Sequence, residues 1–441
     1  MNYLIKGVRA IDPAIGLDAT RDIAIVDGVI AKIDQFIEPT EDMIVLDRGG
    51  KIAIPGLVDV HVHLRDPGFE YKETIETGTA AAAHGGFTDI CSMANTDPTT
   101  DEAALVDYII DKAQKAGHCT VHPSGACTKG LKGEALAEMG DMVAHGAVAF
   151  TDDGRGIQDA GMMRRVMDYA KMFDKVIMSH CQDESLVGSG QVNEGPVSTR
   201  LGLAGWPAAG EEVQIQRDIA LSELTGCSLH IQHLTTAKGL DLVREGKQRG
   251  AKVTCEATPH HLVLCDEDVT ATYDTNLKMN PPLRGKADNA ALIEAVKDGT
   301  IDVIATDHAP HAAFEKEREF ELAPFGITGL ETSLGLVNTY LVKAGHIDYD
   351  RLVELMCINP RDILRIPQVM LEVGSIADIT LFDPEATWTV KAEDMYSKSL
   401  NSPFIGYELT GRPTDVFCKG ALTLEDGVVC QRSSENDEDR A

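Results

Sequence analysis

The chain has 441 residues, of which 43% are hydrophobic and 25% charged, which is the composition of a globular protein with room for one large domain and a smaller one. Its formal charge is −30, and no cluster of Lys and Arg residues appears, so nucleic acid is not an expected partner. No apolar run approaches the ~20 residues that cross a membrane, and the start lacks a secretory signal, so we expect a cytoplasmic protein with reduced cysteines and no membrane partner.

Both ends of the chain alternate apolar and polar residues as β-strands do. Within residues 1–54 this pattern covers 22–26 and 29–33, with a turn predicted at Asp27–Gly28. Residues 366–430 alternate in the same way, and residues 431–441 are polar and charged, which predicts a disordered tail. Neither end offers enough strands for a well-covered sheet of its own. We therefore predict a small composite β-sandwich domain built from both termini.

The residues between them, 55–365, alternate short apolar runs with stretches of helical length. The runs are 57–63, 87–95, 119–123, 147–153, 176–180, 228–233, 252–260 and 301–307. Helices are expected at 74–84, 102–116, 159–171, 211–224, 237–248 and 287–297, with Gly117, Gly226 and Gly250 at helix ends. Eight such units predict an α/β fold of the (β/α)8 TIM-barrel type, whose reactive groups sit at the C-terminal ends of the strands.

Five of these runs end in residue types that bind metals. His61 and His63 share one strand and, with a period of two, point to the same face. The other ends carry either Asp152 or Asp153 and then His180, His233 and Asp307. Each residue alone is explained equally well as a rim histidine or a helix cap. Together they predict four imidazoles and two carboxylates around two divalent metals and a shared water.

Several longer motifs resemble those of class I dihydroorotases in the amidohydrolase superfamily. They are Asp59-Val-His-Val-His-Leu-Arg-Asp-Pro-Gly, Ser92-Met-Ala-Asn-Thr, Phe150-Thr-Asp-Asp-Gly, Lys278-Met-Asn-Pro-Pro-Leu-Arg, Asp307-His-Ala-Pro-His and Ala323-Pro-Phe-Gly-Ile-Thr-Gly-Leu-Glu-Thr. The resemblance runs from about residue 3 to residue 430. It implies the reversible cyclisation of N-carbamoyl-L-aspartate to (S)-dihydroorotate plus water in de novo pyrimidine (UMP) biosynthesis.

The same resemblance implies a role for each candidate ligand. It assigns His61, His63 and Asp307 to a first Zn2+, and His180 and His233 to a second. Many relatives bridge the two ions with a carboxylated lysine, but residues 146–154 contain none, so Asp153 rather than Asp152 is the expected bridge, together with a hydroxide. Asp307 is then the expected catalytic residue, which accepts the proton of the attacking hydroxide and delivers it to the departing nitrogen.

A substrate with a carboxylate needs a cationic partner in this acidic protein. Arg65 lies two residues after His63 on the predicted rim and can bind a carboxylate through two hydrogen bonds. The resemblance adds further residues near the substrate, namely His63, Asn95, Asn280, His311, Phe325 and Gly326. The segment 307–325 is predicted to be an active-site lid, and its charged middle, 311–322, is expected to contribute little to the core.

Two other functions fit parts of this pattern. One is a different cyclic amidase, such as a dihydropyrimidinase, hydantoinase or allantoinase, although these typically use the lysine that is missing here. The other is a catalytically silent, dihydroorotase-like scaffold of aspartate carbamoyltransferase, although such proteins lose metal ligands and this chain retains all six. A homodimer is expected by resemblance, and association with aspartate carbamoyltransferase stays open.

Overall fold

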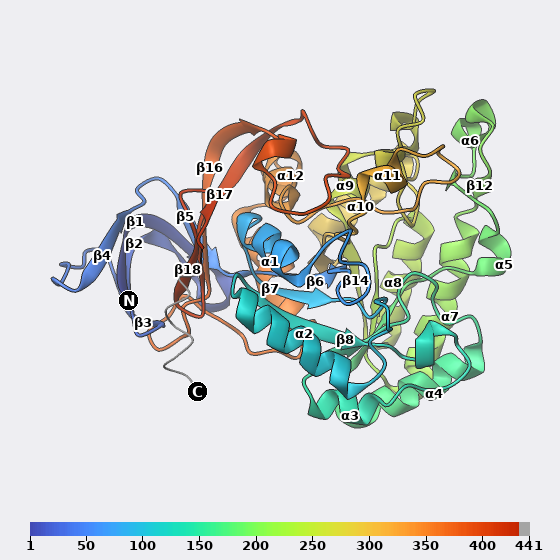
Figure 1. Cartoon of the computed structure of the whole chain (residues 1–441), viewed down its shortest axis with the longest axis horizontal. Coiled ribbons are helices and arrows are strands. Elements are labelled where there is room, and N and C mark those ends of the chain that lie inside the picture. Colours follow the sequence, from blue (N-terminus) through green and yellow to red (C-terminus); the bar gives the residue numbers. More distant parts are fainter. Residues whose placement is uncertain (432–441) are drawn as a thin grey trace.

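The computed structural model of the protein describes residues 1–431, and the predicted tail lies outside the described residues apart from Gln431 (Figure 1). All eight predicted barrel strands are present, and they pair in parallel in chain order within one sheet. They are β6 (Leu57–Val62), β7 (Phe87–Ser92), β8 (Thr120–Gly125), β9 (Ala149–Phe150), β10 (Val176–Ser179), β13 (Leu229–Ile231), β14 (Val253–Ala257) and β15 (Val303–Ile304). The predicted barrel is therefore confirmed.

The barrel closes through residues that follow its last strand. Because β15 has only two residues, the contact with β6 is made by His308, which forms a parallel bridge with Val62. The N–H of His63 donates to the carbonyl of His308 at 2.8 Å. This closure brings the ends of the first and eighth strands side by side.

The six predicted helices cover the outside of the barrel, and each end lies within two residues of its expected position. They are α1 (Ile75–His84), α2 (Ala103–Ala116), α4 (Ala160–Ala170), α7 (Ala209–Thr225), α8 (Ala237–Arg249) and α10 (Lys286–Asp298). Thr74 caps α1 by accepting a hydrogen bond from the N–H of Thr77. Gly117, Gly226 and Gly250 end their helices with φ of 71°, 71° and 88°, a conformation that glycine adopts without steric cost.

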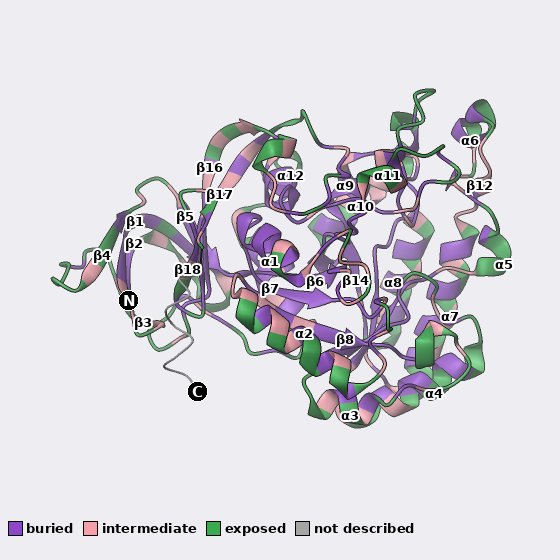
Figure 2. Cartoon of the chain, in the orientation of Figure 1, coloured by how far each residue is buried: buried purple, intermediate pink, exposed green. Residues whose placement is uncertain are grey.

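Shorter elements fill the loops at the two ends of the barrel. They are α3 (Met139–Ala144), α5 (Glu184–Val187), β11 (Val192–Asn193), α6 (Pro196–Leu201), β12 (Gly205–Trp206), α9 (Pro259–Val263), α11 (Ala313–Lys316), α12 (Ser333–Val337), α13 (Tyr349–Val353) and α14 (Asn359–Leu364). The barrel strands are buried, whereas the outer faces of the helices are exposed (Figure 2). No helix of residues 1–431 is long and apolar enough to cross a membrane.

The two ends of the chain meet beside the barrel, as predicted, in one nine-stranded sheet (Figure 1). Its N-terminal strands are β1 (Asn2–Asp12), β2 (Leu17–Val26), β3 (Val29–Asp34), β4 (Met43–Asp47) and β5 (Ile52–Pro55). The C-terminal strands are β16 (Ile379–Thr389), β17 (Glu408–Cys418), β18 (Ala421–Glu425) and β19 (Val428–Val429). Antiparallel pairing of β5 with β16 joins the two sets, which enclose one shared apolar core.

The segment 307–325 is more firmly built into the fold than its composition suggests. Phe320 is buried in an apolar cluster, and the buried ammonium of Lys316 donates to the carbonyls of Thr275 and Pro324. The ammonium of Lys278 donates in turn to the carbonyl of Phe320 at 2.6 Å. Most of residues 311–322 are exposed, as their composition predicts, but Lys316 and Phe320 are buried, and backbone carbonyls bind the ammonium of Lys316.

Candidate metal centre

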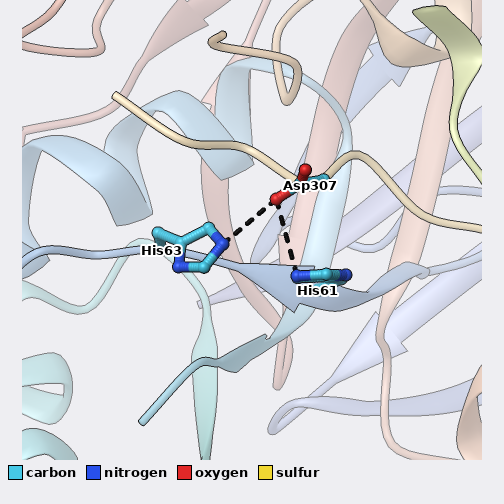
Figure 3. A group of neighbouring side chains, drawn as sticks. All are labelled: His61, His63 and Asp307. Carbon is cyan, nitrogen blue, oxygen red and sulfur yellow. Dashed lines mark hydrogen bonds and ion pairs between the residues drawn. The ribbon is translucent and has the colours of Figure 1, made fainter. Parts of the chain in front are cut away.

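The three residues expected to bind the first ion lie together at the closing seam of the barrel. His61 and His63 come from the end of β6, and Asp307 follows β15 (Figure 3). His63 Nε2 lies 3.0 Å from Asp307 Oδ1, and His61 Nε2 lies 3.5 Å from the same oxygen. Two nitrogens and one carboxylate oxygen therefore face a common point.

Asp153, just beyond β9, lies between two pairs of histidines. Its Oδ1 is 3.5 Å from His61 Nε2, and its Oδ2 is 3.4 Å from His63 Nε2. On the other side, the same Oδ1 is 3.3 Å from His180 Nδ1 and 3.9 Å from His233 Nε2. This carboxylate therefore lies between the imidazole nitrogens of both pairs.

Asp152 points away from this group. Its Oδ1 accepts hydrogen bonds from the N–H groups of Cys127 and Thr128, at 2.9 and 3.0 Å. Asp153 Oδ1, in contrast, is buried and accepts no hydrogen bond from the described residues. The geometry therefore favours Asp153 over Asp152, a choice that the spacing of residues left open.

His180, after β10, and His233, after β13, face each other on the far side of Asp153. His180 Nδ1 lies 2.9 Å from His233 Nε2. Two imidazole nitrogens at this distance need either one shared proton or one shared cation between them. The pair therefore fits a second metal position.

Three of the histidines have their second ring nitrogen bound to an acceptor of the protein. The pairs are His61 Nδ1 with Glu256 Oε1 at 2.6 Å, His63 Nδ1 with Asn95 Oδ1 at 2.9 Å and His180 Nε2 with Gln182 Oε1 at 2.8 Å. Each acceptor can hold a proton on the outer nitrogen, which leaves the inner nitrogen as the one that faces the other candidate ligands. This is the arrangement that orients metal-binding histidines in proteins.

The electrostatics of the site follow from placing carboxylates and imidazoles together. Burial alone would lower the pKa of His61, but Glu256, Asp307 and Asp153 raise it well above its usual value. Burial opposes ionisation of Asp307, yet the charge on His61 and the hydrogen bond to His63 lower its pKa to about 2. Burial and the neighbouring His180 and His61 lower the pKa of His233 to about 3. Asp307 is thus an anion and His233 a neutral imidazole at neutral pH.

Three residues at the site have left-handed backbones although none is glycine. They are Arg65 with φ of 61°, His233 with φ of 31° and Asp307 with φ of 48°. Such residues are strained and persist where the surroundings hold them, as at functional sites. For His233 the constraint is visible, because its N–H donates to Glu256 Oε1 at 3.0 Å.

The donor set fits a divalent metal centre. Ligand atoms about 2.0–2.1 Å from a tetrahedral Zn2+ are about 3.3 Å apart. The separations across Asp307 and Asp153 cluster around this value, and the ligand atoms of two residue groups lie within 4.8 Å of one another. The groups are His61, His63 and Asp307, and His61, Asp153 and His233.

The side chains of Arg65, Lys72 and His311 lie next to this cluster, and Lys72 forms an ion pair of 3.0 Å with Glu315. Arg65 is half-buried, donates to the carbonyl of Pro310 at 3.2 Å and lies 3.4 Å from His311 Nε2. His311 Nε2 is also 2.8 Å from the carbonyl of Phe325, and Lys72 Nζ is 3.3 Å from His311 Nδ1. Burial, followed by the charges of Arg65 and Lys72, lowers the pKa of His311, which keeps it neutral. Within residues 1–431, no carboxylate oxygen lies within 4 Å of the Arg65 guanidinium.

The remaining predicted substrate residues lie on the same rim. Asn95 Nδ2 donates to Asp153 Oδ2 at 3.4 Å, so Asn95 contacts two candidate ligands. Asn280 Nδ2 donates to Gln182 Oε1 at 2.9 Å, and its buried Oδ1 has no hydrogen-bond partner among the described residues. A buried amide oxygen in this state is an acceptor for an N–H group of a ligand.

The backbone at Phe325 and Gly326 is already partly engaged. The N–H of Gly326 donates to the carbonyl of Lys278 at 3.0 Å, and the carbonyls of Phe325 and Gly326 lie 2.8 Å from His311 Nε2 and 3.1 Å from Asn401 Nδ2. Gly326 has φ of 126°, and a Cβ at this position would lie 2.8 Å from the Cβ of Ala309. Only glycine fits this close approach.

Three residues that contact the candidate site residues were not predicted from the sequence. Glu256 lies within β14, inside the seventh run and not at its end, and Gln182 lies two residues after His180. Lys72 has no motif around it, and its contact with His311 comes from loop packing alone. None of the three ends a predicted apolar run, so a search for ligand residue types at the strand ends overlooks them.

The fold and the site define the class of the protein. Solved structures with the same architecture include an L-hydantoinase (dihydropyrimidinase) from Arthrobacter aurescens, 27% identical with a TM-score of 0.87, which aligns over 98% of this chain and 97% of its own. A D-hydantoinase (dihydropyrimidinase) from Thermus sp. is 26% identical with a TM-score of 0.84 over the same shares. The protein is a cyclic amidohydrolase with a barrel fold and a cluster of residues suited to a metal cofactor.

Sequence relatives narrow this class to one family. A model of the dihydro-orotase-like family matches residues 50–239. The dihydroorotases of Acetivibrio thermocellus and Pelotomaculum thermopropionicum are 48% and 50% identical to this chain, over 97% of it and 100% of each relative. The chain belongs to the dihydroorotase family.

Proposed function

We propose that this protein is a dihydroorotase that interconverts N-carbamoyl-L-aspartate and (S)-dihydroorotate in pyrimidine biosynthesis. The observation that carries the proposal is the Arg65 guanidinium, which lacks a carboxylate partner among the described residues and lies on the rim that holds His63. A half-buried cation beside an amide-hydrolysing site selects a substrate that brings its own carboxylate. The substrate of a dihydroorotase has that carboxylate.

The cofactor that we propose is a pair of Zn2+ ions. His61, His63 and Asp307 would hold one ion, His180 and His233 the other, and Asp153 would lie between them. When bound, such ions polarise a substrate carbonyl and lower the pKa of a water molecule. The nitrogen-rich donor set with buried carboxylates suits zinc.

Asp307 is the proposed proton carrier. Its low pKa makes it an anion at neutral pH, so it can accept a proton from the attacking water in the ring-opening direction. It then delivers this proton to the departing ring nitrogen, and in the cyclisation direction the same transfers run in reverse. Its Oδ1 lies 3.0 Å from His63 Nε2, beside the residues that would hold the first ion.

Substrate orientation would come from the rim. Arg65 binds the carboxylate, with His311 beside it and Asn95 between the carboxylate and the metal ligands. The free Oδ1 of Asn280 accepts from a ring N–H, and the carbonyls of Phe325 and Gly326 line the same side.

The test separates this function from that of the hydantoinases with the same fold. Arg65→Leu removes a charge-assisted pair of roughly 1.5–3 kcal/mol, so kcat/KM for dihydroorotate should fall at least about tenfold. Dihydrouracil lacks the carboxylate, and its slow hydrolysis should barely change. Arg65→Lys should recover only part of the loss, because an ammonium lacks the planar pair of donors. An unchanged ratio of the two kcat/KM values would refute the assignment of Arg65.

We also propose a homodimer in the cytoplasm, on the strength of the family resemblance, with association to an aspartate carbamoyltransferase as a further question. Light scattering of the purified protein, alone and mixed with that enzyme, measures both. A monomer of about 47 kDa would contradict the dimer.

A further inference from the structure

A short segment between β16 and β17, residues 397–402, leaves the β domain and packs against the rim of the barrel. Four of its residues are polar and almost fully buried, with exposures of 3–5%: Ser397, Ser399, Asn401 and Ser402. Buried polar side chains in a loop need specific partners, and those of Ser397, Ser399 and Asn401 belong to the two loops that carry Arg65 and His311.

Asn401 uses its whole side-chain amide on one of these loops. Its Nδ2 donates to the carbonyls of Ala309 at 3.2 Å and Gly326 at 3.1 Å. Its Oδ1 accepts from the N–H of His311 at 3.0 Å. The two N–H donors and the one oxygen acceptor of the amide thus pair with three backbone groups, which fixes the orientation of the side-chain amide.

The neighbouring residues hold the other loop. Ser399 Oγ donates to the carbonyl of Lys72 at 2.6 Å. Ser397 Oγ and the N–H of Lys398 donate to the carboxylate of Glu73 at 2.5 and 3.0 Å. Lys72 and Glu73 end the loop that begins with Arg65, so the segment connects this loop to the one that carries His311.

We propose that Asn401 is a positioning residue that sets His311 and Gly326 in place opposite Arg65 and thereby determines substrate affinity. The proposal rests on the proposed dihydroorotase function. The C-terminal part of the chain, on this view, completes the substrate pocket as well as the terminal sheet. Asn401 itself does not touch the metal ligands, so metal content should not depend on it.

Asn401→Asp is the sharpest variant, because it keeps the shape of the side chain. An oxygen replaces the NH2 group and faces the carbonyls of Ala309 and Gly326, which repel it. With full-length, metal-loaded enzyme we expect KM for dihydroorotate to rise about tenfold or more, kcat to change less, and bound metal to stay the same. Should this variant not fold, Asn401→Ala removes the amide donors and acceptor without adding the facing oxygen and carries the same expectation.

Asn338 offers a matched control away from the site. It is also buried, donates through Nδ2 to the carbonyls of Pro384 and Thr410, and accepts from the Tyr349 hydroxyl. Asn338→Asp should lower the melting temperature, as we also expect for Asn401→Asp, but leave KM unchanged.

A double variant that combines Asn401→Asp with His311→Ala gives a second measurement. If Asn401 acts through His311, the two losses in kcat/KM should not multiply.

Two results would overturn the inference. One is a KM for Asn401→Asp no higher than that of Asn338→Asp, and the other is a full multiplication of the Asn401→Asp and His311→Ala losses. Absence of dihydroorotate turnover by the wild-type protein would instead refute the proposed function, and this inference with it. Wild-type turnover separates the two cases.

Discussion

At the scale of single residues, the metal centre depends on where protons sit. A histidine binds a metal only through a nitrogen that has no proton, so the other nitrogen must carry it. Glu256, Asn95 and Gln182 supply acceptors for that second nitrogen on His61, His63 and His180. Only Glu256 does so with a carboxylate, and it reaches the backbone N–H of His233 as well.

Glu256→Gln should therefore weaken metal binding without altering substrate recognition. Burial opposes ionisation of Glu256, but His61 and His230 lower its pKa, so the native residue is an anion and glutamine removes its charge. We expect metal affinity to fall about 10–100-fold, measured by competition with a chelator, while KM of the fully loaded enzyme stays close to the wild-type value.

Asp89→Asn is a suitable control for that experiment. Asp89 is also a buried carboxylate bound to a histidine, His122, and to Arg361, but no described contact links it to the six candidate ligands. The Asp89→Asn variant should therefore be less stable than wild type but bind metal with the same affinity. Equal metal affinity in wild type and Glu256→Gln would show that the carboxylate is dispensable for His61.

Asp307→Asn separates metal binding from proton transfer. Five candidate ligands remain, so much of the metal should be retained, whereas an amide cannot accept the proton. Turnover should fall by about 10²–10⁴-fold, the usual contribution of a general acid or base. Metal content by atomic absorption and kcat from dihydroorotate ring opening measure the two effects. Activity within tenfold of wild type would exclude the proton-carrying role.

At the scale of elements, segment 307–325 shows how a polar loop is anchored to the barrel rim. Lys316 of the segment donates to the carbonyls of Thr275 and Pro324, and Lys278 outside it donates to the carbonyl of Phe320. Burial, together with the nearby charge of Lys278, lowers the pKa of Lys316 from 10.5 to about 7. Burial lowers the pKa of Lys278 to about 8.

The lowered pKa of Lys316 predicts a pH-dependent stability. Between pH 7 and about 10.4, the unfolded chain holds a proton that the folded chain lacks. The unfolding free energy contributed by this group thus rises with pH in that window and falls as the pH drops towards 7. Lys316→Met lacks the group, so wild type should gain stability relative to the variant between pH 7 and 9 in urea unfolding. If the difference in unfolding free energy between wild type and Lys316→Met does not change with pH, the carbonyls keep Lys316 charged in the folded protein.

At the scale of the whole molecule, the parts of the chain are interdependent. The β5–β16 pairing joins the termini, and residues 397–402 cross back to the barrel rim. The domain limits at 54/55 and 365/366 stay predictions, and a cut at 365 would remove Asn401 from the site. The centre also gathers imidazoles and buried carboxylates, whose charges a bound cation would balance.

Metal removal should consequently destabilise the entire fold. A metal that binds only the folded state adds about 4 kcal/mol when its free concentration is 1,000 times Kd. Dialysis against a chelator should lower the melting temperature measured by calorimetry, and Zn2+ should restore both the melting temperature and activity, whereas Mg2+ should not. If the melting temperature does not change after metal removal has been verified, the metal does not stabilise the fold.

The sequence predicted the barrel strands, the six helices and the terminal β domain, because each depends on local period, capping residues and turn glycines. Strand ends such as His61, His63 and Asp307 were also predictable, since parallel strands place their C-terminal ends on one rim. The pattern left Asp152 and Asp153 equivalent, and the hydrogen bonds of Asp152 to Cys127 and Thr128 separate them in space.

Only the tertiary structure could reveal Glu256, Lys72 and Asn401. Their contacts join residues far apart in the chain, from strand to strand or from the C-terminal segment to the rim. It also revealed that Lys316 is buried in segment 307–325, because the free energy of burying this lysine depends on carbonyls that no pattern displays. Local sequence determines which residues end each strand, whereas three-dimensional packing decides which side chains hold them there.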